Sequence, residues 1–377
     1  MLPPPDENIR QSVMQFCLDQ CGTATVRDAL PDGGQRSHNQ MLYNAVAARG
    51  WLALAVPPPY GGGSVRIPEL CTVLEELAYA RAPLSAMGAS LSVANTYARV
   101  GNEAQQRELL PKILRGVPQG LALSEPDAGS DLAAISCRAE PADGGFEVSG
   151  RKSWVSNARL GDDVLVAVRT SGEVGSRRGL SLLRIDIAAA GVHLEPCNAL
   201  GPHEAWDLEL DRVAVNHRNL IGEEGAAWGD LMAGLSYERL ILAASMLGRA
   251  RRTFDDAVAY SQARTQFGHP VGSYQALKHT FADLATELWA CRLIVADLAR
   301  ECAGSGGAAD PVHASMTKLK ITETAKRTAL VAAQVMGAEH HRQGSEVSID
   351  LNAAVGATIY GGTSEIQREV IGRGLGL

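Results

Sequence analysis

The chain has 377 residues, more than one hydrophobic core usually serves, so we expect two or three domains. It carries 42 acidic and 35 basic residues, a formal charge of −7, and has no dense run of lysine and arginine. This balance argues against nucleic acid or an anionic membrane surface as the main partner. No apolar run reaches the ~18–20 residues of a spanning helix, and the start lacks the pattern of a secretory signal. A cytoplasmic protein is expected.

The cysteine, histidine and serine residues argue against three further kinds of site. The seven cysteines are odd in number and scattered without a CxxC pair, which is typical of small buried thiols in a reducing compartment. His340 and His341 are neighbours, but no H-E-x-x-H or comparable ligand spacing occurs, so no metal site is expected. Ser124 and Ser130 have no nearby histidine and no G-x-S-x-G frame, which argues against a hydrolase triad.

The first part of the chain has helical periodicity. Apolar residues such as Leu70 and Leu74 recur at helical spacing, and Glu75 and Glu76 are expected to face away from them. The sequence therefore predicts an N-terminal α-helical domain over residues 1–118.

The middle of the chain has the pattern of strands and turns. Short alternating runs such as DVLVAV and LSLLRID are separated by turn sequences, including DGG at 143–145. About one hundred residues of this kind suffice for a small barrel or sandwich. We predict a middle β domain over residues 119–228.

Helical spacing then returns and continues to the end. The long helical stretches run roughly over 229–266, 273–303 and 311–338, with a flexible GSGGAA link at 304–309. Long helices joined by short turns predict a C-terminal four-helix-bundle domain over residues 229–377. The helical, β, helical order has no strand–helix alternation, and no G-x-G-x-x-G follows a candidate strand. A doubly wound nucleotide-binding sheet is therefore not expected.

The first candidate site is the polar segment LALSEPDAGSDLAA at 121–134, where helix gives way to strand. Ser124, Gly129 and Ser130 can present N–H and hydroxyl groups to a polar ring or a phosphate. A surface loop that caps the first strand explains the same composition and is the simpler interpretation.

The second candidate is GRKSWVSNA at 150–158, which places Trp154 and Ser156 on one face of a strand. An aromatic plane beside a hydroxyl can flank a planar heterocycle and bond to its edge. An ordinary half-buried tryptophan in a β domain is the simpler alternative.

The third candidate is Glu238. It falls in a helical stripe with Leu231, Leu235, Leu242 and Ser245, where a carboxylate is costly unless it is paired or protonated. Burial can raise its pKa towards the range of a general base at neutral pH. An ion pair with Arg239 or with a neighbouring helix explains the position equally well.

Five segments, in this order, together resemble the acyl-CoA dehydrogenase family of flavoproteins. They are LALSEPDAGSD at 121–131, GRKSWVSNA at 150–158, RTQFGHPVGSYQALKH at 264–279, QVMGAEHH at 334–341 and IYGGTSEIQREVIGR at 359–373. The resemblance covers nearly the whole chain. It implies an N-terminal helical domain, a central β-barrel or sandwich and a C-terminal four-helix bundle, assembled as a homotetramer or dimer that binds flavin adenine dinucleotide (FAD).

The resemblance also assigns roles by position. One side of the flavin would be lined by Leu121, Leu123, Ser124, Gly129 and Ser130, and the other by Trp154, Val155 and Ser156. From an adjoining subunit, the diphosphate and adenosine would be held by Arg264, Gln266, Phe267, Gln275, Gln334 and Gly337. Thr363 and Glu365 would approach the cofactor from the last signature, and Ser130, Arg239, Gly361 and Gly362 would contact substrate. The acyl cavity would be bordered by Ser92, Asn95 and Thr96.

One departure from the family pattern is informative. Many members carry their catalytic glutamate immediately before the Gly-Thr of the last signature, where this chain has Gly361. Members resembling isovaleryl- and long-chain acyl-CoA dehydrogenases carry it on the first bundle helix, just before an arginine. That position here is Glu238, followed by Arg239. The resemblance therefore implies that Glu238 is the catalytic base.

Two smaller departures concern other contacts. The paired glycines of the adenine-side loop appear as Gly337-Ala338, and an Arg-Asp that precedes the last signature appears as Leu351-Asn352. These changes affect the expected grip on the dinucleotide and the subunit contacts.

The implied reaction is α,β-dehydrogenation of an acyl thioester of CoA or of a carrier protein, including an aminoacyl group. Glu238 would remove the α proton while the β hydride passes to the flavin, and a backbone N–H at Gly361 would stabilise the developing enolate. Electrons would leave to an electron-transfer flavoprotein. The alternatives are a flavin-dependent oxidase or monooxygenase on the same scaffold, and a non-catalytic subunit of a mixed assembly.

Overall fold

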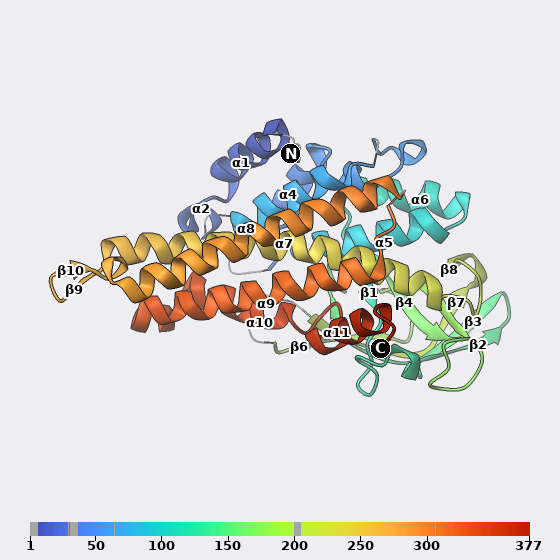
Figure 1. Ribbon diagram of the computed structural model, residues 1–377. Helices are drawn as coiled ribbons and strands as arrows, with labels where there is room; N and C mark the ends of the chain where they lie inside the picture. Colours follow the sequence, from blue (N-terminus) through green and yellow to red (C-terminus); the bar gives the residue numbers. More distant parts are fainter. Residues whose placement is uncertain (1–6, 29, 31–36, 64, 200–204, 306) are drawn as a thin grey trace. The chain divides into compact units, whose positions relative to one another are not determined.

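The structure is a computed structural model that describes residues 7–28, 30, 37–63, 65–199, 205–305 and 307–377. The chain folds into two compact units. Figure 1 shows the helices and strands from which they are built. The first, here called the bundle unit, comprises Met1–Leu30, Ile67–Ala82 and Ser236–Leu377. The second, called the β unit, comprises Pro31–Arg66 and Pro83–Leu235. The link expected at 304–309 includes residue 306, which lies outside the described residues.

The bundle unit is built from helices at both ends of the chain. Its helices are α1 (Glu7–Gln20), α2 (Ala24–Asp28), α4 (Ile67–Tyr79), α7 (Trp228–Ala263, which begins in the β unit), α8 (Gln275–Gly304), α9 (Pro311–Met336), α10 (Glu346–Ala357) and α11 (Ser364–Gly374). A hairpin of β9 (Thr265–Gln266) and β10 (His269–Pro270) and the turn η5 (Val271–Ser273) join α7 to α8, and η6 (Gly337–His341) follows α9. Helix α1 packs on α4, α4 on α8, α8 on α9, and α9 on both α10 and α11.

The ends of α9 show how the sequence sets these helices. Asp310 is the N-cap, and its carboxylate accepts from the backbone N–H groups of Val312 and His313 at 2.9 Å each. Pro311 occupies the first helical position, where its missing N–H costs nothing. Gly337 ends the helix with a φ of +58°, a conformation that favours glycine.

The expectation that Glu75 and Glu76 face away from the core was wrong. Both carboxylates on α4 are buried, because they pair with arginines of the same unit. Glu75 accepts from Arg10 at 3.0 Å and from Arg251 at 2.5 Å, and Arg251 also reaches Glu76 at 3.0 Å. Helical periodicity cannot distinguish a solvated charged face from one that meets oppositely charged partners.

The β unit combines one main sheet with short helices. Its strands are β1 (Gly120–Ala122), β2 (Arg138–Ala142), β3 (Gly145–Ser156), β4 (Asp163–Arg169), β5 (Leu180–Asp186), β6 (Val192–Cys197), β7 (Ala205–Asn216) and β8 (Leu220–Ile221). They follow the order β6-β7-β3-β1-β4-β5-β8, and β2 pairs with β3 and β4. The helical elements are α3 (Gln40–Ala48), η1 (Leu52–Ala55), η2 (Pro58–Tyr60), α5 (Ala86–Val100), α6 (Glu103–Leu114), η3 (Leu132–Ala134) and η4 (His217–Asn219).

Strand β4 is buried on both faces, and each face belongs to a different core. Leu165 and Ala167 share a cluster with Tyr97 of α5 and Leu110 of α6. The alternate residues of β4, including Val166, join a second cluster formed by the other strands. A continuous apolar strand such as DVLVAV is the expected sequence for a strand covered on both sides.

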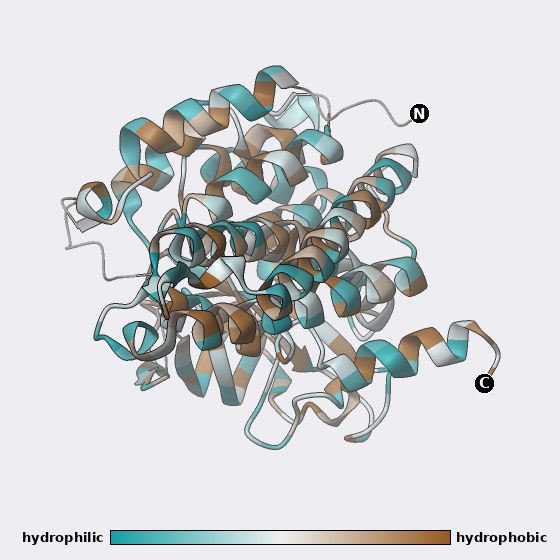
Figure 2. Ribbon diagram, turned by 60° about the vertical axis from the view of Figure 1, so that its left-hand side comes forward, coloured by the Kyte–Doolittle hydropathy of each residue, from teal (hydrophilic) through white to brown (hydrophobic). Residues whose placement is uncertain are grey.

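The predicted fold class is confirmed: helices, a central β region and helices again, in that order along the chain. The domain boundaries at 118/119 and 228/229 stay a prediction. Every long helix carries both polar and apolar stretches (Figure 2), and no described helix is long and apolar enough to span a membrane.

Candidate active site

Glu238 lies on α7, partly buried, and its carboxylate is unpaired. No hydrogen bond or ion pair joins it to any other residue that the structure describes. The neighbouring Arg239, the partner expected under the simpler interpretation, is buried and directs its guanidinium to Ser315 Oγ at 3.4 Å. An ion pair between Glu238 and Arg239 is therefore not what holds this carboxylate in the bundle unit.

The turn at Gly361 lies directly beside this carboxylate. A methyl group added at Gly361 would lie 4.0 Å from Glu238 Oε1 and 3.3 Å from Leu242 Cδ2. The carboxylate of Glu238 thus occupies the space towards which a side chain at position 361 would point. Positions 238 and 361 are the two places where family members carry the catalytic glutamate. They are far apart in sequence but lie side by side in the bundle unit.

Two buried side chains hold the turn in place. Lys318 on α9 is fully buried, and its Nζ donates to the carbonyl oxygen of Gly362 at 2.7 Å. Gln367 on α11, also fully buried, donates through Nε2 to the carbonyls of Gly361 at 3.2 Å and Gly362 at 2.8 Å. Both glycines have positive φ values, +67° and +88°, which suit a turn of this kind. These three hydrogen bonds hold both carbonyls of the turn.

The charged groups around Glu238 shift one another's pKa values. Burial raises the pKa of Glu238 above the ordinary glutamate value, and the cations Arg239 and Lys318 only partly oppose this. Burial, assisted by Arg239, lowers the pKa of Lys318 to about 8. A carboxylate with a raised pKa and no partner is suited to accept a proton.

The apolar stripe expected around Glu238 is not the most buried face of α7. Leu235, Leu242 and Ser245 are only partly buried, as is Glu238. The fully buried positions are on another face and include Tyr237 and Leu240. Periodicity therefore identified the face that carries Glu238 but overestimated its burial, because several faces of this long helix are covered.

The loop at 121–134 in the β unit is anchored by an ion pair that the sequence did not reveal. Lys152 on β3 is fully buried and donates to Glu125 Oε1 at 2.7 Å and to the carbonyl of Leu123 at 3.0 Å. Glu125 also accepts from the N–H and hydroxyl of Ser136, at 2.8 and 2.7 Å, and from the N–H of Cys137 at 2.9 Å. These hydrogen bonds therefore anchor the loop to β3 and to the segment at residues 136–137.

The pKa of Glu125 moves in the opposite direction to that of Glu238. Burial alone would raise it, but the Lys152 ammonium and the hydrogen bonds from Ser136 outweigh burial and hold the pKa below the usual range. Glu125 is thus an ionised carboxylate with every acceptor site used.

On this anchored loop, the residues assigned to the flavin lie near the surface. Leu121, Leu123 and Ser124 are partly buried, and Gly129 and Ser130 are exposed. The register pairs Leu121 with Ser156 of β3, and Ser153 donates its N–H to the carbonyl of Ser124 at 2.9 Å. The structure therefore brings the first two candidate segments together.

Strand β3 turns its tryptophan outward. A register shift between Lys152 and Val155 marks a bulge, and Trp154 within it has a φ of +61° and is 64% exposed. Val155 is buried, whereas Ser156 is exposed. An exposed indole plane next to an exposed hydroxyl, above a fixed loop, fits a planar heterocycle with polar edges. This arrangement fits the isoalloxazine of FAD.

The segments assigned to the diphosphate and adenosine lie at the opposite end of α7 and on α9. Phe267 is at the tip of the β9–β10 hairpin, with a φ of +52° and 93% exposure. The other residues of this set, Arg264, Gln266, Gln275, Gln334 and Gly337, are all exposed as well. These six exposed residues are open to a ligand or to another chain.

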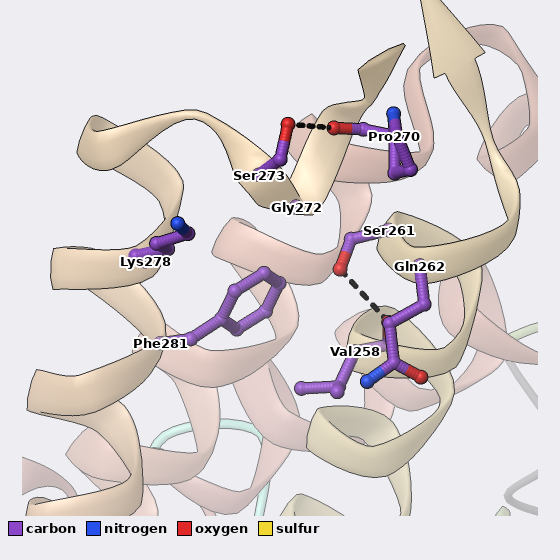
Figure 3. A pocket seen from close by; sticks show the side chains of 8 residues that line it. All are labelled: Val258, Ser261, Gln262, Pro270, Gly272, Ser273, Lys278 and Phe281. Carbon is purple, nitrogen blue, oxygen red and sulfur yellow. Dashed lines mark hydrogen bonds between the residues drawn. The ribbon is translucent and has the colours of Figure 1, made fainter.

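A cavity of about 440 Å³ lies beside this segment, between the end of α7, η5 and the start of α8 (Figure 3). Its walls are Val258, Ser261, Gln262, Pro270, Gly272, Ser273, Lys278 and Phe281. The close approach of η5 to α7 favours glycine at position 272, because a methyl group there would lie 2.7 Å from Ser261 Oγ and 3.1 Å from the Ser261 carbonyl oxygen. None of the residues assigned from the sequence lines this cavity.

The last signature forms the start of α11. Thr363 is the N-cap and accepts from the N–H of Ile366 at 3.2 Å, while Glu365 is exposed in the first turn. No group of three or more His, Cys, Asp or Glu side chains within the described ranges is placed to hold a metal ion.

The fold and each of the two candidate regions fit the expectation of a flavin-dependent oxidoreductase. Comparison with known families agrees. The models of the acyl-CoA dehydrogenase N-terminal, middle and C-terminal domains match residues 4–117, 120–213 and 225–376.

Individual relatives give the same result. Mitochondrial isovaleryl-CoA dehydrogenase of Arabidopsis thaliana is 34% identical over 372 residues, 97% of this chain and 90% of the relative. The L-prolyl-[peptidyl-carrier protein] dehydrogenase of Pseudomonas fluorescens is 29% identical over 87% of this chain and 88% of its own length. The crystal structure of acyl-CoA dehydrogenase from Geobacillus kaustophilus matches with a TM-score of 0.90 and 27% identity, covering 100% of this chain and 99% of that one.

The chain belongs to the acyl-CoA dehydrogenase family. The predicted class, an FAD-dependent oxidoreductase that acts on the CH–CH bond of acyl thioesters, is thereby confirmed. Sequence reasoning missed Glu125, Lys152, Lys318 and Gln367. No local signal marks them, because each lies in a segment that contains several other polar residues.

Proposed function

We propose that this chain dehydrogenates an acyl thioester with Glu238 as the base that removes the α proton. One observation carries the proposal: the unpaired, partly buried carboxylate of Glu238 lies 4.0 Å from where a side chain at Gly361 would begin. The lack of a glutamate at position 361 is thus compensated by a carboxylate that reaches the same place from α7.

The chemistry follows from this arrangement. A thioester makes the neighbouring C–H acidic, but a carboxylate removes that proton only if the enolate oxygen is stabilised as it forms. The backbone N–H of Gly361 is suited to this, because Lys318 and Gln367 bind the carbonyls of the turn and fix its orientation. Arg239 and Gly362 complete the proposed set of substrate contacts.

We assign the flavin ring to the outward face of the β unit. Leu121, Leu123, Ser124, Gly129 and Ser130 would line one side, and Trp154, Val155 and Ser156 the other. FAD, when bound, supplies the acceptor for the β hydride. Thr363 and Glu365 would approach it from the last signature. The anchored loop and the exposed indole support this assignment.

We further propose that a second copy of the chain completes the cofactor site. Arg264, Gln266, Phe267, Gln275, Gln334 and Gly337 would hold the diphosphate and adenosine of a neighbour's FAD in a homodimer or homotetramer. The exposure of all six residues supports this, and above all the 93% exposure of Phe267.

The remaining elements of the proposal concern partners and location. The thioester is carried by CoA or by a carrier protein, as in the relative named L-prolyl-[peptidyl-carrier protein] dehydrogenase. An electron-transferring flavoprotein accepts the electrons, and the protein works in the cytoplasm.

Anaerobic titration of the FAD-loaded protein tests the proposal. Short-chain acyl thioesters of CoA and of a carrier protein are added, and the flavin absorbance near 450 nm is followed. Bleaching by at least one thioester, with formation of the 2,3-unsaturated product, is the expected result. A protein that binds FAD but is bleached by no thioester, or that consumes oxygen rapidly without an electron carrier, would contradict it.

A further inference from the structure

Arg169, the last residue of β4 in the β unit, is a fully buried arginine. Its guanidinium donates four hydrogen bonds, and each acceptor is a backbone carbonyl oxygen. No carboxylate of a described residue forms an ion pair with it. A buried cation without a counter-ion is costly, so its hydrogen bonds must compensate for the loss of water. Those bonds therefore indicate what this side chain does.

The four carbonyls belong to two separate segments of the β unit. Nε donates to the carbonyl of Ile135 at 3.0 Å, and Nη1 donates to that of Arg178 at 3.0 Å. Nη2 bonds to both segments, to the carbonyl of Ala133 at 2.7 Å and to that of Ser176 at 3.2 Å. The planar guanidinium, with its fixed fork of donors, thus joins the two segments to each other.

The first segment closes an exposed stretch that we call the arch, residues 126–132. The arch carries Gly129 and Ser130, two exposed residues that we assign to the flavin. At its start, Lys152 binds the carboxylate of Glu125 at 2.7 Å. At its end, the guanidinium binds the backbone directly after the arch. The arch is therefore tied to the sheet at both ends, and buried cations make both connections.

The second segment is the connection between β4 and β5, here called the outer loop, residues 171–179. Most of its residues are exposed. Besides the bonds from the guanidinium, the N–H of Gly175 donates to the carbonyl of Ala133 at 2.8 Å. The outer loop is thus bonded to the end of the arch, and a displacement of one segment is transmitted to the other.

We propose that Arg169 is a positioning residue of the flavin site, which sets the arch against the cofactor and couples it to the outer loop. The inference rests on the proposed placement of the flavin on the β unit. Side chains that contact a ligand are placed precisely only when the surrounding hydrogen bonds hold them. A lysine cannot replace this arginine, because a single ammonium nitrogen does not reach four carbonyls on two segments.

Arg169→Lys tests the inference on the flavin itself, without a thioester. We expect the Kd for FAD to rise about tenfold, the equivalent of one lost hydrogen bond. The reduction potential of the bound flavin should become more negative, because displaced donors stabilise the electron-rich reduced ring less well.

Arg184→Lys is the matched control. Arg184 lies on β5 of the same sheet, but its guanidinium bonds to the side chains of Asn219 and Glu108 instead of the arch or the outer loop. This variant should keep the wild-type Kd and potential. An unchanged Kd and potential in Arg169→Lys, or equal changes in both variants, would overturn the inference and leave the proposed function intact. A wild-type protein that binds no FAD would overturn both.

Amide hydrogen exchange in the wild-type protein decides the question even if Arg169→Lys does not fold. We expect FAD binding to slow exchange in the arch and in the outer loop together, because the guanidinium joins them. Slower exchange in the arch alone would overturn the coupling. Unchanged exchange in both segments would overturn the inference together with the placement of the flavin on this face.

Discussion

Two inward-facing glutamates, one in each unit, have opposite surroundings. Glu125 in the β unit meets Lys152 at 2.7 Å and three further donors, and its pKa lies below the usual range. Glu238 in the bundle unit meets no donor among the described residues, and its pKa is raised by burial. Burial disfavours the ionised form of both carboxylates. The direction of each pKa shift therefore depends on whether the fold supplies donors and cations that outweigh burial.

The comparison distinguishes a carboxylate that anchors a loop from one that is suited to accept a proton. The Lys152 ammonium and the Ser136 hydrogen bonds stabilise the ionised form of Glu125 and lower its pKa, so this carboxylate can fix a loop but is a weak base. An unpaired, partly buried carboxylate lowers stability when it is ionised, and groups perturbed in this way cluster at functional sites. The predictions below test this distinction, beginning with the largest expected effect.

Breaking the pair in the β unit should have the largest effect. Lys152→Met leaves the Glu125 carboxylate buried without its cation, which typically costs about 3–5 kcal/mol. We expect a large loss of unfolding free energy in urea and a low flavin content after purification. Lys112→Met, which removes a partly exposed lysine 3.7 Å from Glu108, is the control and should cost less than about 1 kcal/mol. Similar stability of the two variants would show that the buried pair does not anchor the loop.

Releasing the turn beside Glu238 should affect catalysis more than stability. Lys318→Met removes the donor to Gly362 O, so the turn that carries the Gly361 N–H loses one of its three hydrogen bonds from buried side chains. Misplacement of this kind costs about 10–100-fold in rate. We expect that loss in the rate of anaerobic flavin bleaching at saturating thioester, with flavin content retained. Lys320→Met, at a partly exposed lysine paired with Glu287, should keep the wild-type rate. An unchanged rate in Lys318→Met would remove Lys318 from the account.

Adding a side chain to the turn should have a moderate effect. Gly361→Ala places a residue with a Cβ at a φ of +67° and brings its methyl 3.3 Å from Leu242. The left-handed conformation costs about 1–2 kcal/mol. We expect this loss in urea unfolding, whereas Gly372→Ala, in open space on α11, should be neutral or slightly stabilising. Equal stability of both variants would show that the turn relaxes to another conformation.

The smallest effect concerns the pH dependence of stability. The pKa of Glu238 is raised in the folded state, so the folded protein binds this proton more tightly than the unfolded chain. Stability therefore falls as pH rises above the ordinary glutamate value and through the folded pKa. Glu238→Gln removes this contribution. Melting temperatures at pH 5 and pH 8 should differ less in the variant than in the wild type, and a larger difference in the variant would contradict the assigned shift.

The sequence was sufficient for the order of the elements, and it singled out Glu238 as the candidate for the base. Periodicity separated helical from strand regions, because the residues of each element repeat its own period. Glu238 was found because a carboxylate in an apolar stripe breaks a local rule. The pair of Glu125 and Lys152 broke the same rule less visibly, since each lies in a short segment where polar residues are common.

Contacts between distant segments could not be predicted. Nothing near Gly361 in sequence indicates that Glu238 lies beside it, or that Lys318 binds the next carbonyl. Likewise, α1 and α4 form one unit with helices from the other end of the chain, and the burial of Glu75 depends on Arg251. Such pairings are set by packing over long sequence separations, which local patterns do not record.

The most direct test of the central claim is single-turnover flavin bleaching in Glu238→Gln. The variant replaces a base by an amide of the same size, so FAD content and thioester binding should match the wild type. Under anaerobic conditions with a thioester that reduces the wild type, we expect the bleaching rate to fall by about 10²–10⁴-fold. A variant that keeps its flavin and bleaches within about threefold of the wild-type rate, far from the loss expected for a missing base, would show that another group takes the proton.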